Sequence, residues 1–271
     1  MKTPGAATAL LIVIPSVLFV AFPGRLLITR ISVAPIYVAC GLCIISLGSL
    51  TATMRLDPGI IPKLPPLPNF QPKRVQNVVV HGRLVRLKWC GTCNLFRPPR
   101  TSHCSVTDAC IEQFDHYCPF VGAAIGKGNY RAFLIFIFAT ALLTLFVLSA
   151  SICHLITDAQ SPKSRETRTG FFMAMKSNPI SMLLIGYTFS ASFFVCGLAG
   201  FHVYLVSTGV TTSEQLKKDF NQGNPYDKGC MRNIVSVFCS ASTRKPMKRH
   251  SVSLETTEIT VSSRFREPRW E

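Results

Sequence analysis

Five cysteines lie between Cys90 and Cys118, in a short polar and basic segment that also carries histidines. Cys90 and Cys93 are separated by two residues, a spacing at which two thiolates share one tetrahedral metal ion across a tight turn. His103 and Cys110 follow shortly after and complete a set of three cysteines and one histidine. This donor set is typical of structural zinc sites, so the segment is predicted to bind zinc.

A second group of reactive side chains follows in the sequence Asp115-His116-Tyr117-Cys118. A cysteine attacks as its thiolate, and a neighbouring imidazole lowers the pKa of the thiol or accepts its proton. A carboxylate in turn fixes the tautomer of the imidazole and stabilises the imidazolium. Spacing alone leaves two interpretations open. Cys118 is a nucleophile served by the other two groups, or Cys118 and His116 are two more metal ligands.

The composition indicates a membrane protein. The 271 residues are 48% hydrophobic, with a mean hydropathy of +0.32 and a net charge of +16. Such a charge often indicates nucleic acid as the partner, but no aromatic stacking platform or nucleic-acid motif accompanies it. High hydrophobicity together with basic charge is typical of membrane proteins, whose basic residues gather on one side of the bilayer. We therefore expect the lipid bilayer, and no nucleic acid, as a partner.

Four apolar stretches have the length and composition of membrane spans. Each is free of Lys, Arg, Asp and Glu, and they run over Ala6–Phe22, Val33–Met54, Ala132–Ile156 and Ile180–Val206. The first stretch, preceded by Lys2, also resembles a secretory signal. It lacks an obvious A-x-A cleavage site and a second apolar run follows closely, which favours a true first span.

The basic residues predict the orientation of these spans. Residues 55–131 carry eleven Lys and Arg and residues 207–271 carry eleven more, whereas the loops 23–32 and 157–179 carry six between them. The positive-inside rule therefore places both termini and the long central loop in the cytosol. Because the cytosol is reducing, the cysteine cluster is expected to bind metal or act as thiols and not to form disulfides.

Two segments are not expected to join a packed core. Residues 62–74 are rich in proline and are predicted to form an extended linker. Residues 240–271 are basic and rich in Ser and Thr, a composition typical of disordered tails.

From Trp89 to Phe133, the sequence resembles the cysteine-rich domain of the DHHC protein S-acyltransferases, or palmitoyltransferases, in a variant that reads DHYC. The resemblance covers roughly residues 6–240, in the order and with the spacing of the family. Its most C-terminal motif, at residues 224–233, has the form seen in plant members. The other matching motifs are Asp57-Pro58-Gly59, Arg97-Pro98-Pro99-Arg100, Ser102-His103-Cys104, Asn129-Tyr130-Arg131, Thr211-Thr212-Ser213-Glu214 and Asn224-Pro225-Tyr226-Asp227-Lys228-Gly229 with Asn233.

The resemblance implies an acyl-transfer enzyme. Cys118 would take a long-chain acyl group from acyl-CoA, such as palmitoyl-CoA, and pass it to cysteines of membrane-associated substrate proteins. It also implies that His116 is the general base and that Asp115 orients it. Thr212 resembles the family threonine that contacts this aspartate. The acyl tail would lie in a cavity between the four helices.

The resemblance also implies zinc binding, with a departure in this chain. The family binds two zinc ions, each through three cysteines and one histidine. The first set corresponds to Cys90, Cys93, His103 and Cys110, all present. The second corresponds to Cys104, Thr107, Tyr117 and Ala124, which keep one ligand of four. We therefore predict one structural zinc ion. The lost second site also motivates a rival hypothesis, in which the chain is a catalytically weak or inactive family member that acts as a membrane scaffold.

The predicted fold is an α-helical polytopic membrane protein with four transmembrane helices and a small cytosolic zinc-binding domain between the second and third. Both termini are expected in the cytosol, and an endomembrane (ER, Golgi or vesicles) is favoured over the plasma membrane. The predicted parts are the first two spans (1–56), a linker with the DPG motif (57–88), the cysteine-rich domain (89–131), the third and fourth spans (132–206), the TTxE and C-terminal elements (207–239) and the tail (240–271).

Overall fold

A computed structural model of the chain describes residues 4–66, 75–80, 82–160, 170–220 and 223–239. The predicted disordered tail, residues 240–271, lies outside the described residues. So do residues 67–74 of the proline-rich segment.

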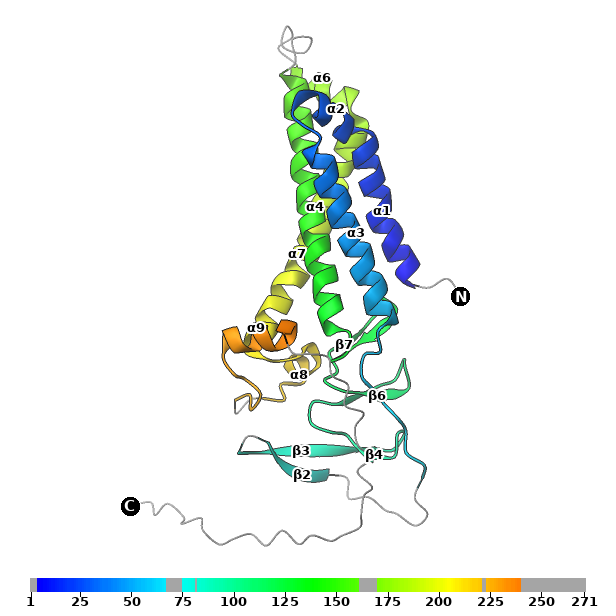
Figure 1. The fold of residues 1–271 in the computed structure, drawn as a ribbon, viewed down its shortest axis with the longest axis vertical. Coiled ribbons are helices and arrows are strands. Elements are labelled where there is room, and N and C mark those ends of the chain that lie inside the picture. Colours follow the sequence, from blue (N-terminus) through cyan, green and yellow to red (C-terminus); the bar gives the residue numbers. More distant parts are fainter. Residues whose placement is uncertain (1–3, 67–74, 81, 161–169, 221–222, 240–271) are drawn as a thin grey trace, which may run out of the picture. The chain divides into compact units, whose positions relative to one another are not determined.

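Four long apolar helices and two short ones form a bundle at one end of the described chain (Figure 1). Its members are α1 (Pro4–Ala21), α2 (Pro23–Arg30), α3 (Ala34–Arg55), α4 (Tyr130–Ala159), α6 (Gly170–Ser177) and α7 (Pro179–Thr208). By length and composition, α3, α4 and α7 are each able to cross a membrane, and α1 with α2 form a pair bent by 40° that passes the same test together. The described residues thus hold three candidate spans, or four if the bent pair is one span.

The helices begin and end where the sequence provides the signals. Proline occupies the first turn of α2, α3 and α7, where its missing N–H costs no helical hydrogen bond. Gly209 ends α7 with φ of +67°, a left-handed conformation that glycine adopts without strain.

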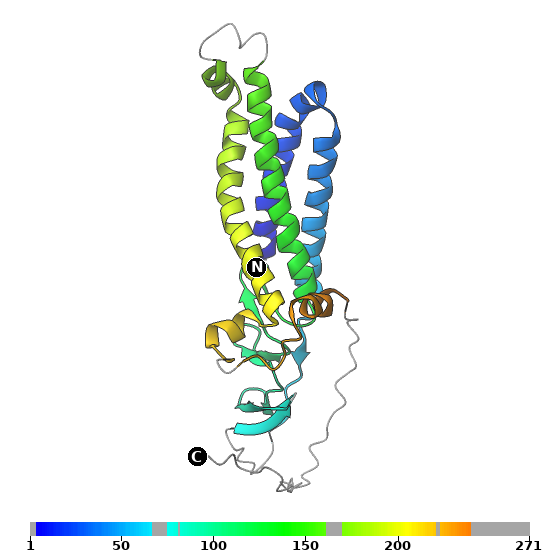
Figure 2. The ribbon, with the colours of Figure 1, turned by 90° about the vertical axis from the view of Figure 1, so that its left-hand side faces the viewer.

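Helix α4 is the centre of the bundle and packs between α3 and α7 (Figure 2). Phe133, Leu134 and Ile137 of α4 are almost fully buried in the main apolar cluster. Large apolar side chains also cover the outside, since Ile44, Leu142 and Phe193 are exposed by 70%, 57% and 85%. An outer surface of this kind fits hydrocarbon and not water, which agrees with the predicted class of helical membrane protein.

Short antiparallel strands fill the sequence between α3 and α4. One sheet has the order β1-β6-β5, a second the order β2-β3-β4, and a third pairs β7 with β8. The strands are β1 (Ile60–Ile61), β2 (Val75–Val80), β3 (Arg83–Cys90), β4 (Leu95–Phe96), β5 (Ser102–Cys104), β6 (Ala109–Ile111), β7 (His116–Cys118) and β8 (Ala123–Ile125). The β2–β3 hairpin falls largely within residues 57–88, which the sequence analysis assigned to a linker.

Two short helices follow the last candidate span. They are α8 (Thr212–Lys217) and α9 (Cys230–Cys239). Both lie near the C-terminal end of α7, on the side of the bundle that carries the strands (Figures 1 and 2).

Candidate active site and metal centre

Strand β7 separates two kinds of side chain. Successive residues of a strand point to opposite faces, so His116 and Cys118 share one face and Tyr117 lies on the other. Cys118 is 8% exposed and belongs to the same apolar cluster as the buried residues of α3, α4 and α7. The thiol therefore lies where the strand layer meets the helix bundle, next to its imidazole.

Asp115 connects this imidazole to the segment that follows α7. Its carboxylate is 2% exposed and accepts a hydrogen bond of 2.6 Å from Nδ1 of His116. It also accepts bonds of 2.8 Å from the backbone N–H and from the hydroxyl of Thr212. Because Nδ1 is taken by the carboxylate, Nε2 of His116 is the ring nitrogen left for the thiol.

The environment favours the charged forms of all three groups. Burial opposes ionisation of Asp115, but its bonds to His116 and Thr212 hold the carboxyl pKa below its ordinary value. Burial also opposes protonation of His116, yet its interactions with Asp115 and Cys118 raise the imidazole pKa to about 9. Burial favours a neutral Cys118, but His116 and the backbone amides of Val121 and Phe120 lower the thiol pKa. These displacements of the pKa values favour a thiolate–imidazolium pair.

The position of Thr212 depends on a buried ion pair. Nε and Nη2 of Arg100 donate to the two carboxylate oxygens of Glu214 at 2.7 and 2.6 Å, and Nη2 also donates to the carbonyl of Gly209 at 2.9 Å. Glu214 and Thr211 form a reciprocal capping box at the start of α8. Arg100 thus fixes the first turn of α8, in which Thr212 faces Asp115.

The DPG motif and Asn129 join the strand layer to the bundle. The carboxylate of Asp57 accepts the backbone N–H groups of Gly59 and Ile60 at 2.7 and 2.8 Å. A side chain at Gly128 would collide with the Asp57 carbonyl, so this approach requires glycine. The buried amide of Asn129 donates to carbonyls of α3 and β8, which fixes the start of α4 against these two elements.

The predicted metal ligands come from two hairpins. Cys90 ends β3 and Cys93 lies in the turn to β4, while His103 of β5 stands opposite Cys110 of β6. Their four ligand atoms all lie within 4.8 Å of one another. Nδ1 of His103 lies 3.6, 3.5 and 4.0 Å from the sulfurs of Cys90, Cys93 and Cys110.

These residues fit a tetrahedral zinc ion. Zn–S and Zn–N bonds of ordinary length at tetrahedral angles put nitrogen and sulfur about 3.6 Å apart, close to the observed separations. Nε2, the other ring nitrogen of His103, lies 3.7 Å from a carboxylate oxygen of Asp108. An outer carboxylate on this side is typical of zinc-bound histidine.

Three of the four residues that correspond to a second metal set lie in an apolar cluster. Tyr117 pairs with Ala124 across β7 and β8, and the two pack with the buried Cys104. Ile111 and Phe114 complete this cluster, whereas Thr107 is exposed. Among the described residues, three or more ligand-type side chains gather only at the Cys90 set.

One pairing of the site escaped the sequence analysis. Arg100 and Glu214 each lie in a motif that it quoted, but their pairing across more than a hundred residues leaves no local pattern. His202, 1% exposed in α7, bonds to the hydroxyl of Tyr130 at 3.0 Å, and its ring centroid lies 6.2 Å from that of His116.

Comparisons with known proteins agree on one family. The sequence model of the DHHC palmitoyltransferase family matches residues 84–219. Palmitoyltransferase ZDHHC14 of Mus musculus is 38% identical over 258 residues, which cover 86% of this chain and 51% of the mouse protein. Protein S-acyltransferase 8 of Arabidopsis thaliana is 38% identical over 260 residues, with 86% of this chain and 62% of the plant protein covered.

A third relative is covered over more of its length. Palmitoyltransferase ZDHHC9 of Danio rerio is 34% identical over 271 residues, which cover 92% of this chain and 68% of the fish protein. The alignments thus span only about half of the mouse relative and about three fifths of the plant relative.

Proposed function

This chain belongs to the DHHC palmitoyltransferase family, and from that membership we propose that it is a protein S-acyltransferase with Cys118 as its nucleophile. The observation that carries the proposal is the buried array of Asp115, His116 and Cys118 at the boundary of the helix bundle. The array supports a reaction in two steps, with palmitoyl-CoA or another long-chain acyl-CoA as donor and membrane-associated proteins as acceptors.

In the first step, the Cys118 thiolate attacks the carbonyl carbon of the acyl-CoA thioester. The bond between this carbon and the sulfur of CoA breaks, and a thioester to Cys118 remains. The leaving CoA sulfur takes the proton of the His116 imidazolium, because the raised pKa of His116 keeps that proton in place near neutral pH. Asp115 and Thr212 hold the ring throughout.

In the second step, neutral His116 takes the proton from a cysteine thiol of the substrate protein. The new thiolate attacks the acyl carbon, and Cys118 leaves as a thiolate beside the imidazolium. The starting ion pair is thereby restored, so no other proton carrier is required.

We assign a structural role to the metal. Cys90, Cys93, His103 and Cys110 would hold one zinc ion, which ties the β3–β4 and β5–β6 hairpins together. The apolar packing around Cys104 and Tyr117 supports a single ion per chain. Neither step of the reaction passes through the metal.

Acyl labelling tests the proposal directly. The purified chain, incubated with alkynyl palmitoyl-CoA, is expected to form an adduct that hydroxylamine removes, as thioesters are. Cys118→Ser should lose this adduct, while Cys196→Ser, which changes a cysteine within α7, should retain it. Equal weak labelling of wild type and Cys118→Ser would overturn the enzyme and favour the scaffold hypothesis.

We further propose four spans, with α1 and α2 as a single bent span. Both termini and the strand layer then lie on the cytosolic side, and the membrane is an endomembrane. The distribution of Lys and Arg supports this orientation. Glycosylation acceptors inserted into residues 31–33, between α2 and α3, and into residues 161–169, between α4 and α6, should be modified in the ER. An acceptor inserted at residue 82, in the turn between β2 and β3, should not be. Modification at residue 82 would reverse the orientation.

A further inference from the structure

Helix α9 carries a stripe of apolar side chains that nothing in the described residues covers. Met231, Val235 and Phe238 follow at intervals of four and three residues, which places them on one side of the helix. They are exposed by 72%, 52% and 38%, high values for apolar residues so close to one another. The stripe therefore lacks a partner within the described chain.

The opposite side of α9 is firmly attached to the bundle. Ile234 and Val237 pack against the main apolar cluster, and Nε of Arg131 in α4 donates to the Val237 carbonyl at 3.1 Å. The buried Asn233 donates to the carbonyl of Ser207 near the end of α7 at 2.9 Å. Since both contacts lie at the ends of candidate spans, α9 is held at the level where those spans would leave a bilayer (Figures 1 and 2).

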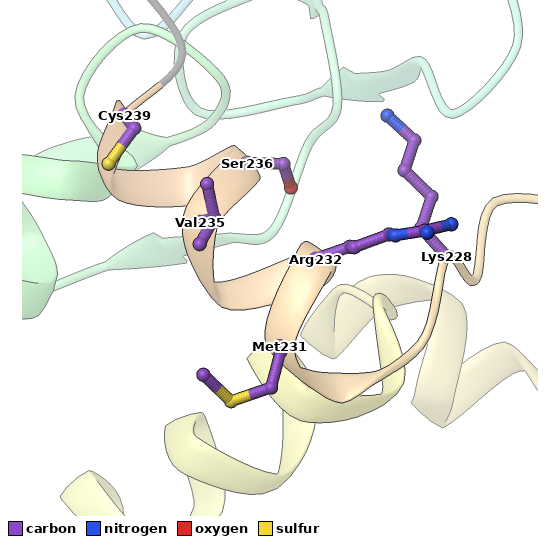
Figure 3. Close-up of a pocket in the computed structure, with 6 residues that line it drawn as sticks. All are labelled: Lys228, Met231, Arg232, Val235, Ser236 and Cys239. Atoms are coloured by element: carbon purple, nitrogen blue, oxygen red, sulfur yellow. The ribbon is translucent and has the colours of Figure 1, made fainter.

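Basic side chains adjoin the stripe. Lys228 and Arg232 line an open hollow of about 340 Å³ together with Met231, Val235, Ser236 and Cys239. Figure 3 shows Arg232 of α9 and Lys228 of the segment before it extending to the same side, away from Met231 and Val235. No Asp or Glu occurs in α9. An apolar stripe with basic residues beside it is typical of helices that lie in the headgroup region of a membrane.

We propose that α9 is an interfacial helix that docks on anionic phospholipid. Met231, Val235 and Phe238 enter the boundary of the acyl chains, and Lys228 and Arg232 bind lipid phosphates. Two observations select lipid as the occupant: the attachment of α9 to the ends of α4 and α7, and the positive charge beside the stripe. This inference goes beyond acyl transfer and does not depend on it.

Tryptophan fluorescence in nanodiscs measures the insertion of the stripe. Met231→Trp and Val235→Trp are placed in phosphatidylcholine–phosphatidylserine nanodiscs with a phosphatidylcholine brominated near the top of its acyl chains, which quenches nearby indoles. Wild type gives the background of the native Trp89 and Trp270. Both variants should be strongly quenched and blue-shifted, while the control Ser236→Trp, on the polar side, should be quenched much less. Equal quenching of all three overturns the proposal.

Charge removal tests the contact with anionic lipid. Adding Lys228→Gln and Arg232→Gln to Met231→Trp should lower the ratio of docked to undocked helix roughly 25-fold, from losses of about fivefold per basic residue. In discs of phosphatidylcholine alone, the same pair of changes should have little effect. Arg86→Gln with Lys88→Gln, which removes the same two charges from β3, is the matched control and should leave the quenching unchanged. A loss of quenching as large in the control pair, or in neutral discs, contradicts the proposed lipid contact.

Discussion

At the scale of single residues, the proposed reactivity of Cys118 rests on opposite pKa displacements of its own thiol and of the neighbouring His116 imidazole. The thiol pKa is lowered and the imidazole pKa is raised to about 9, so the charged pair exists between these two values. An ordinary cysteine, with a pKa near 8.5, is only a few per cent thiolate at neutral pH. The hydrogen bond of Asp115 to His116 thus acts on the nucleophile through the imidazole.

Alkylation of Cys118 by iodoacetamide is expected to show this pair without any substrate. In wild type, the rate should reach its plateau at a lower pH than that of an ordinary cysteine, because His116 lowers the pKa of the thiol. In His116→Ala, the thiol pKa should return toward its ordinary value, and the rate near neutral pH should fall roughly tenfold. The pH profile is measured by mass spectrometry of the Cys118 peptide. His154→Gln, a change within α4, is the control. The same profile in His116→Ala and wild type would contradict the ion pair.

Thr212 stabilises the Asp115 carboxylate with its hydroxyl as well as its backbone N–H. Thr212→Val removes only the hydroxyl bond, and hydrogen bonds to charged groups contribute about 1.5–3 kcal/mol. We expect acyl-enzyme formation to slow by roughly 10- to 100-fold, measured as the initial rate of alkynyl-palmitate labelling. Thr212→Ser keeps a hydroxyl and should restore most of the rate. If the serine variant is as slow as the valine variant, the hydroxyl bond is not the cause.

At the scale of elements, part of the site could be predicted from sequence and part could not. The apolar runs predicted α3, α4 and α7, since uncharged stretches of that length have few alternatives. The Cys90 set was predicted because Cys90 and Cys93 are local neighbours, with His103 and Cys110 shortly after them. The β2–β3 hairpin was not anticipated, although Val85, Leu87 and Trp89 alternate with basic residues in the manner of a strand. Proline in the preceding segment directed the interpretation toward a linker.

The contact between α8 and the cysteine-rich segment could not be predicted by reasoning from the sequence alone. Thr212 and Asp115 meet across 97 residues, and Arg100 meets Glu214 across 114. No periodicity encodes such a distance, and only the resemblance to a family indicated the first of these pairs. Arg100 also has φ of +63°, a left-handed backbone conformation that is uncommon for residues other than glycine.

Breaking the Arg100–Glu214 pair should therefore cost far more stability than breaking the exposed pair of Lys127 and Glu112. The two side chains are 15% and 7% exposed, and removing one partner of a buried pair costs about 3–5 kcal/mol. Glu214→Gln is expected to lower thermal stability and to slow acyl labelling, because α8 no longer holds Thr212. Arg100→Lys should also lower thermal stability and slow acyl labelling, since lysine cannot donate to both carboxylate oxygens in the way that the guanidinium does. Lys127→Gln breaks the exposed pair with Glu112 and should cost less than about 1 kcal/mol. Equal losses of stability from Glu214→Gln and Lys127→Gln would contradict this role of the Arg100–Glu214 pair.

At the scale of the whole molecule, the thiol depends on two different kinds of scaffold. On one side, the apolar bundle surrounds Cys118 through α3, α4 and α7. On the other, the predicted zinc ion ties the hairpins that precede β7 in the chain. A structural zinc contributes folding free energy on the order of 10 kcal/mol in isolated zinc peptides, far more than the small apolar cluster of Cys104, Tyr117 and Ala124. The folding of the strand layer should thus depend on the bound zinc ion.

Two cysteine variants separate the metal set from the apolar cluster. Cys110→Ser removes a proposed ligand, so the zinc content should fall from one ion per chain to nearly none, and Cys118 should lose its enhanced alkylation rate as the hairpins loosen. Cys104→Ser changes a thiol that is equally buried but lies in the apolar cluster, so it should keep its zinc and most of its reactivity. Metal is counted by atomic spectroscopy on the purified chain, and reactivity by the alkylation assay. Two tightly bound ions in wild type, or loss of zinc from Cys104→Ser, would show that Cys104 belongs to a second metal site.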